Sequence, residues 1–95
     1  MLMTVEVAMN EKRVMRLDMG VGGGWTANEV YLRPYSPLAL VTFAHGIDVQ
    51  NARLDLDKGM FIDSVPAGAS PGLGQAIATV VIQRAESGRQ PAQSF

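Results

Sequence analysis

The hydrophobic and polar residues near the start of the chain alternate with the period of a β-strand. Residues 12–19 place Met15, Leu17 and Met19 opposite Arg16 and Asp18. Residues 3–9 alternate in the same way, with apolar side chains at Met3, Val5, Val7 and Met9. A period of two places such side chains on one face of a strand. With Asn10-Glu11 as the turn, the pattern predicts an N-terminal β-hairpin.

Four glycines then occur within residues 20–24. Glycine loses more backbone freedom on folding than any other residue, so the run favours a flexible connector or a bulge. A phosphate-binding G-x-G-x-x-G loop is not indicated, because its third glycine would fall on Trp25.

Residues 26–33 are compatible with either a helix or a strand. Thr26 and Glu29 have the spacing of a helix capping box. Val30-Tyr31-Leu32 contains the β-branched and aromatic residues that strands prefer. Pro34 would end a helix within two turns, and the sequence leaves both alternatives open.

Two further segments predict strands. Residues 38–44 are almost continuously apolar, which is typical of a central strand covered on both faces. Residues 52–56 alternate again, and residues 60–65 return as a second strand. Asp57-Lys58-Gly59 between them predicts a three-residue hairpin loop, with Gly59 in the left-handed position.

The last element is a helix. Ser70 suits its N-cap and Pro71 its first position. Gly88 suits the position after its last turn, and residues 89–95 then form a flexible polar tail. The apolar residues that recur at helical spacing are Leu73, Ala76, Ile77 and Val80.

Together these segments predict an α+β fold. Its mostly antiparallel sheet has about five strands, from two β-hairpins and a central apolar strand. One C-terminal helix packs on one face of the sheet. We expect residues 1–88 to form a single domain, followed by the tail at 89–95, since a chain of 95 residues suits one domain.

Composition narrows the class of protein. The chain is 47% hydrophobic, so it can build one core, and its net charge of -1 gives no reason to bind nucleic acid or an anionic membrane. It contains no cysteine, which excludes disulfides and thiolate metal sites. Its apolar stretches are far shorter than the ~20 residues of a membrane span, and its start does not resemble a signal peptide. We therefore expect a cytoplasmic protein.

The titratable residues do not indicate catalysis. Asp48 could orient His45, the single histidine, but a strand end followed by a turn explains this pair more simply. Asp55 and Asp57 share a strand face beside two basic residues, as is ordinary for a solvated strand. We expect no catalytic residue, no metal site and no cofactor, and the sequence does not favour an enzyme.

Residues 65–77 run from a strand into the predicted helix. The Gly-x-Gly at the helix start would expose backbone N–H groups at the positive end of the helix dipole, where anions bind. The stretch resembles a degraded form of the pyrophosphate turn of GNAT-type acetyltransferases, with Ala69 at the position of that family's arginine or glutamine. The resemblance implies a phosphate or acyl-CoA site at Ser70, Gly72, Leu73 and Gly74. The alternative is a plain helix cap whose glycines allow close packing on the sheet.

The apolar surface of the helix is wider than one sheet requires. Ile82 lies almost opposite Leu73 on the helical wheel, whereas a helix on a sheet needs an apolar face of about 100°. Two explanations remain open: a partner covers the excess, or residues 20–37 fold over the helix. We expect a symmetric dimer, with an interface at Ala78, Val81, Ile82 and Ala85.

The sequence thus favours a small homo-oligomeric binding or interaction module without catalytic activity. The alternative is a domain that binds a small ligand, either acyl-CoA or phosphate, at the helix start Gly72-Leu73-Gly74.

Overall fold

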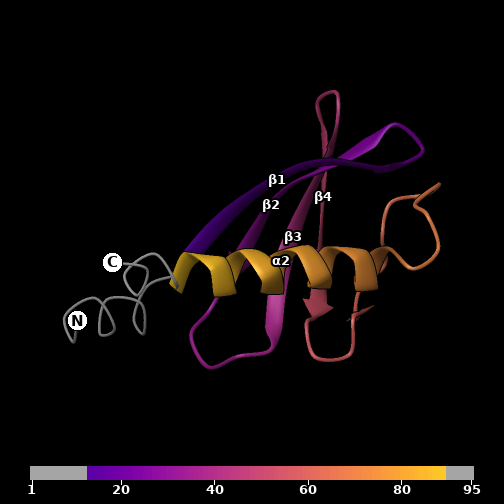
Figure 1. Cartoon of the computed structure of the whole chain (residues 1–95). Coiled ribbons are helices and arrows are strands. Elements are labelled where there is room, and N and C mark those ends of the chain that lie inside the picture. Colours follow the sequence, from indigo (N-terminus) through magenta and orange to yellow (C-terminus); the bar gives the residue numbers. More distant parts are fainter. Residues whose placement is uncertain (1–12, 90–95) are drawn as a thin grey trace.

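Within residues 13–89, which the computed structural model describes, five strands pair in sequence order and one helix crosses their sheet (Figure 1). All four pairings are antiparallel, which confirms the predicted α+β fold. Residues 3–9, the first strand of the predicted N-terminal hairpin, lie outside the described residues. The elements are β1 (Arg13–Gly22), β2 (Trp25–Leu32), β3 (Leu38–His45), β4 (Asp48–Asp55), β5 (Met60–Phe61) and α2 (Leu73–Arg89).

The glycine-rich run forms a tight hairpin turn. β1 ends at Gly22 and β2 begins at Trp25, so Gly23 and Gly24 connect them, with φ angles of 64° and 84°. Positive φ at both central residues is typical of the type I′ turn, whose twist matches that of paired strands. The expectation of a flexible connector was wrong, because these glycines supply the φ values that the turn requires, whereas the alternative of a bulge agrees with the register shift between Gly20 and Gly22.

The same turn packs against the segment that leads into α2. A Cβ atom on Gly22 would overlap the carbonyl oxygen of Gly68, and one on Gly23 would lie 2.6 Å from the carbonyl oxygen of Ala67. The Ser70 N–H donates a hydrogen bond of 2.9 Å to the Val21 carbonyl. Backbone therefore lies directly on backbone where the chain enters the helix.

Residues 25–32 form a strand, and the capping-box alternative is wrong. Ala27 and Val30 are both fully buried, although they are three residues apart. A register shift between Ala27 and Glu29 accommodates this spacing, because the extra residue, Asn28, brings both apolar side chains to one face. The capping-box spacing of Thr26 and Glu29, which left a helix open as an alternative, thus occurs within a bulged strand.

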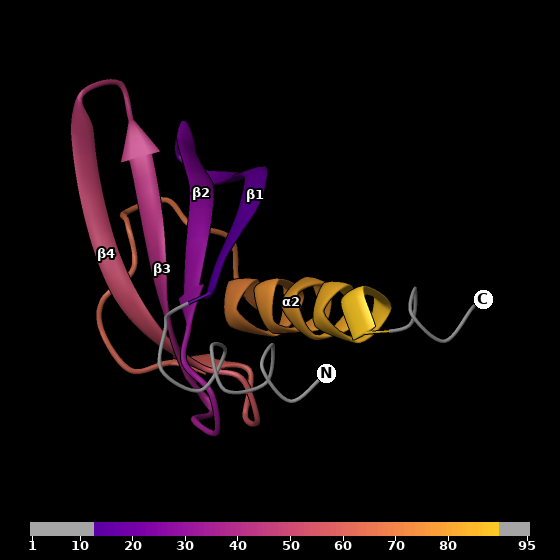
Figure 2. The ribbon, with the colours of Figure 1, turned by 90° about the vertical axis from the view of Figure 1, so that its left-hand side faces the viewer.

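The core lies between α2 and one face of the sheet, and Figure 2 shows the helix on that side. β3 is the third of the five strands, as expected for the most apolar segment. However, only one of its faces is fully buried, and Leu38 on the other face is 36% exposed. The expectation that both faces are covered was therefore wrong. The buried side chains are Leu17, Val21, Ala27, Val30, Ala39, Val41, Phe43, Ala52, Leu54, Leu73, Ile77, Ala78 and Val81.

The second predicted hairpin is confirmed, with a shorter return strand. Gly59 has the expected positive φ of 67°, and the Asp55 carboxylate accepts hydrogen bonds from the N–H groups of Asp57 and Lys58. β5 ends at Phe61 instead of residue 65. Beyond it, the Asp63 carboxylate accepts a hydrogen bond of 2.9 Å from the Arg53 N–H. A side-chain oxygen thus replaces the backbone carbonyl that a longer β5 would offer.

The helix begins and ends later than expected. Gly72 has a φ of 77°, which is not helical, and its carbonyl accepts the N–H of Ala76 at 3.1 Å, so Gly72 occupies the N-cap in place of Ser70. Gly88 lies within α2, which continues to Arg89. Ala76, predicted to face the core, is exposed. Residues 90–95 of the predicted tail lie outside the described residues.

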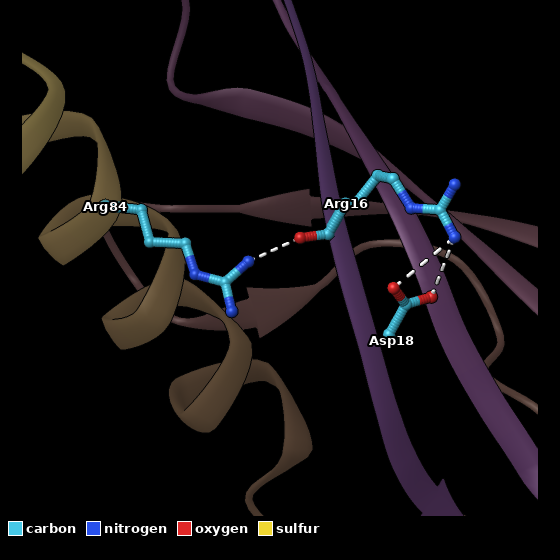
Figure 3. Close-up of polar contacts among 3 residues, drawn as sticks. All are labelled: Arg16, Asp18 and Arg84. Carbon is cyan, nitrogen blue, oxygen red and sulfur yellow. Dashed lines mark hydrogen bonds and ion pairs between the residues drawn. The ribbon is translucent and has the colours of Figure 1, made fainter.

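A hydrogen bond joins the far half of α2 to β1, as Figure 3 shows. The Arg84 guanidinium donates to the carbonyl oxygen of Arg16. The Arg16 side chain pairs with Asp18 at 3.4 Å. Asp18 has a positive φ of 52° and lies where the β1–β2 register shifts, which is the geometry of a bulge.

The close contact at the β1–β2 turn leads to a stability prediction for Gly23→Ala. We expect this substitution to destabilise the protein by ~1–3 kcal/mol, because alanine must adopt a left-handed backbone while its Cβ meets the Ala67 carbonyl. Chemical denaturation monitored by circular dichroism measures the change.

Gly20→Ala is the matched control. Gly20 has no heavy atom within 4 Å of an added Cβ and no positive φ. We expect a change in the free energy of unfolding within about 0.5 kcal/mol. Equal losses in the two variants would contradict the proposed role of the turn contact.

Candidate functional site

The sheet face opposite α2, here called the open face, carries a row of large side chains that crosses four strands. Cross-strand register aligns Val14 with Tyr31, Tyr31 with Leu40, and Leu40 with Arg53. Ile62 extends the row at the β5 side, where its N–H donates to the Arg53 carbonyl at 2.8 Å. The row alternates along each strand with residues of the buried face.

Much of the exposed apolar surface lies on this open face. Val14, Val49, Met60 and Ile62 each expose more than half of their surface, at 53%, 63%, 62% and 51%. Single exposed apolar residues are ordinary, whereas several on one surface are typical of a contact site. The open face is therefore the first candidate surface.

A pocket of about 330 Å³ lies on this side of the sheet, beside the β2–β3 loop. Its walls are apolar where Leu38 and Leu40 contribute, and its rim carries hydroxyl and guanidinium groups. The lining residues are Tyr31, Arg33, Ser36, Leu38, Ala39, Leu40 and Arg53.

Arg53 in the pocket wall is neutralised by Asp63. The guanidinium Nε and Nη2 donate to the Asp63 carboxylate at 3.0 and 2.9 Å, a bidentate pair. These bonds lower the pKa of Asp63 to about 2 and raise the pKa of Arg53. The pair also holds the chain beyond β5 beside β4.

Tyr31 is oriented by Glu29, two residues before it on β2. The phenol donates a hydrogen bond of 3.0 Å to the Glu29 carboxylate. This bond, together with the negative charge of Glu29, raises the pKa of Tyr31. The phenol therefore stays protonated and presents its oxygen lone pairs as acceptors.

The sequence-predicted anion site lies at the start of α2, close to other parts of the chain. The N–H of Ser70 is already bonded to Val21, and Leu73 is buried. Gly72 is exposed, while Gly74 is buried so close to the Gly59 carbonyl that a Cβ would overlap its oxygen. Gly74 thus permits close packing of the helix on the β4–β5 loop.

The predicted interface residues of α2 lie on different sides of the helix. Ala78 and Val81 are 2% and 1% exposed, because they pack on the sheet of the same chain. Ile82 is 41% exposed and Ala85 is half-buried. The alternative in which residues 20–37 bury Ile82 is wrong, because its side chain remains exposed.

His45 and Asp48 are cross-strand neighbours where β3 ends and β4 begins. This position agrees with the expectation of a strand end followed by a turn. The His45 ring lies against Trp25, with ring centroids 5.4 Å apart. Within residues 13–89, no three histidine, cysteine or carboxylate side chains are grouped to hold a metal ion.

Sequence reasoning missed the open face and its pocket. The weak alternation of residues 38–44 suggested a strand buried on both sides, and only the register shows which of its side chains lie beside Tyr31 and Arg53. The sequence did contain one indication of an apolar second face, because Leu38 and Leu40 are two residues apart and therefore share one face of the strand.

No protein-family model matches the chain, and no curated protein or solved structure shows significant similarity to it. The helix of the described region, α2, lacks the length and apolar character that crossing a membrane requires.

The Arg53–Asp63 pair predicts a dependence of stability on acid pH. The folded-state pKa of Asp63, about 2, lies below its ordinary value of 3.8, so the ionised carboxylate stabilises the folded state. This contribution is complete above pH ~4 and is lost as the pH falls towards about 2. Denaturation of the wild type and Asp63→Asn across this range should give curves that converge at low pH.

Asp57→Asn is the control, since within residues 13–89 its carboxylate accepts no hydrogen bond. We expect this variant to be less destabilised at neutral pH than Asp63→Asn. If Asp63→Asn gives no convergence with the wild type at low pH, the pair does not stabilise the fold.

Proposed function

We propose that the protein is a small, non-catalytic interaction module that forms a symmetric homodimer through the open face of its sheet. The observation that carries this proposal is the row Val14–Tyr31–Leu40–Arg53, extended by Ile62 and lying opposite the face that α2 covers. Two sheets that pack face to face bury such side chains between them at a separation of about 10 Å.

The size of the open face supports a second copy as its occupant. β2, β3 and β4 each have eight residues, and β1 has ten. Four strands about 4.8 Å apart, with a rise of ~3.3 Å per residue, give a face of roughly 500 Å². Two such faces reach the roughly 1,000 Å² that a specific interface requires.

Charge does not oppose self-association. The net charge of -1 produces little repulsion between two copies. The open face also carries both signs, since Arg16 and Glu29 are cross-strand partners next to the apolar row. A two-fold interface uses the same surface on both copies, so a surface of mixed charge is suitable.

The helix contributes less to this proposal than the sequence suggested. Ala78 and Val81 are buried against the sheet of their own chain. Of the predicted interface residues, only Ile82 and Ala85 are therefore accessible to a partner. A lone exposed isoleucine is common on monomeric surfaces. We therefore assign the dimer to the sheet and retain the helix surface as the competing location.

Substitution of exposed residues tests the location of the interface. We expect the wild type to be dimeric, and Val49→Glu and Val14→Glu to give folded monomers, because each buries an unpaired charge between the sheets. Size-exclusion chromatography with light scattering measures the mass, and circular dichroism verifies folding.

Ile82→Glu is the matched control, since it introduces the same charge on the exposed side of α2. We expect this variant to remain dimeric. A monomeric Ile82→Glu together with dimeric Val49→Glu and Val14→Glu would transfer the interface to the helix. A monomeric wild type at high micromolar concentration would refute the dimer.

A further inference from the structure

The pocket beside the β2–β3 loop combines an apolar wall with groups that donate hydrogen bonds. Leu38 and Leu40 point to the open face from β3, and Tyr31 lies next to Leu40 on β2. The Ser36 hydroxyl accepts the Leu38 N–H at 3.2 Å, which leaves its own proton free to donate. The polar rim therefore favours a ligand that accepts hydrogen bonds.

The two arginines of the pocket differ in their charge balance. Arg53 is paired with Asp63, as described above. The Arg33 side chain makes no ion pair or hydrogen bond with any residue of the described range 13–89. Within that range no carboxylate balances its positive charge at the rim, and its planar fork matches the two oxygens of a carboxylate.

The volume limits the size of the ligand. About 330 Å³ lies at the lower end of the range of roughly 300–1,000 Å³ that is typical of ligand pockets. A short aliphatic acid suits this space, because its chain can cover the leucines while its head reaches the rim.

We propose that this pocket binds a small organic carboxylate with an apolar body. The carboxylate lies on Arg33 and the Ser36 hydroxyl, and the body lies on Leu38 and Leu40. Tyr31 forms the side wall, where its phenol is held by Glu29. All of its lining residues belong to one chain, but Tyr31, Leu40 and Arg53 also lie in the row proposed as the dimer interface, so a ligand and a second copy would compete for this part of the open face.

Titration with octanoate, followed by amide chemical shifts, tests the site. We expect saturable shifts concentrated in residues 31–40 and at Arg53. Acetate, which lacks the apolar body, and 1-octanol, which lacks the charge, should each bind at least about tenfold more weakly, because the site uses both parts of the ligand. Equal binding of octanol and octanoate would overturn the role of the carboxylate.

Two charge-removing variants locate the binding group. Arg33→Gln should weaken octanoate binding about tenfold or more without loss of the fold, because Arg33 is exposed. Arg16→Gln removes the same charge from the open face outside the pocket, and its affinity should stay within about twofold of the wild type. Equal losses in both variants, or shifts centred away from residues 31–40, would refute the site.

The same titration of Val49→Glu separates this proposal from the dimer. Val49 does not line the pocket, so the folded, monomeric variant should bind octanoate at least as tightly as the wild type. Loss of binding in a folded Val49→Glu variant would contradict a site contained within one chain.

Discussion

The structure depends on one constraint: the sheet has two faces, and a single helix can cover only one of them. α2 covers one face of the five strands, and the side chains that it covers form the core of the described region (Figure 1). Every β-strand also directs half of its side chains to the opposite face. The apolar residues on that second face, from Val14 to Ile62, follow from this geometry, as do the pocket and the proposed dimer.

Local sequence determined most of the strands but not all of their boundaries. The hairpin at Gly59 was predictable because its turn chemistry lies within a few residues, with Asp55 as the acceptor for the turn N–H groups. β2 was ambiguous because Thr26 and Glu29, on either side of its bulge, have the spacing of a helix capping box. The start of α2 was misplaced because Gly72 has a positive φ of 77°, which is not helical and so moves the N-cap two residues past Ser70.

The candidate site was less predictable than the fold. Its parts come from β2, the β2–β3 loop, β3 and β4, and only cross-strand register brings Tyr31, Leu40 and Arg53 into one row. The sequence placed the dimer interface on α2 because a helical wheel shows all apolar residues of the helix but not which of them contact the sheet. In the structure that contact includes Ala78 and Val81, which narrows the surface left over.

Asp63 also affects how the sheet meets other chains. Beyond the two-residue β5, its carboxylate occupies the N–H of Arg53 that another strand would otherwise bond. A foreign strand approaching this border meets a short, charged edge at which the Arg53 N–H is already bonded, and short, charged edges are one way in which natural sheets discourage open-ended growth. Edge-to-edge addition of further chains at this border is thus disfavoured. Face-to-face packing of two copies, in contrast, buries the open face of both and leaves no such face for a third copy.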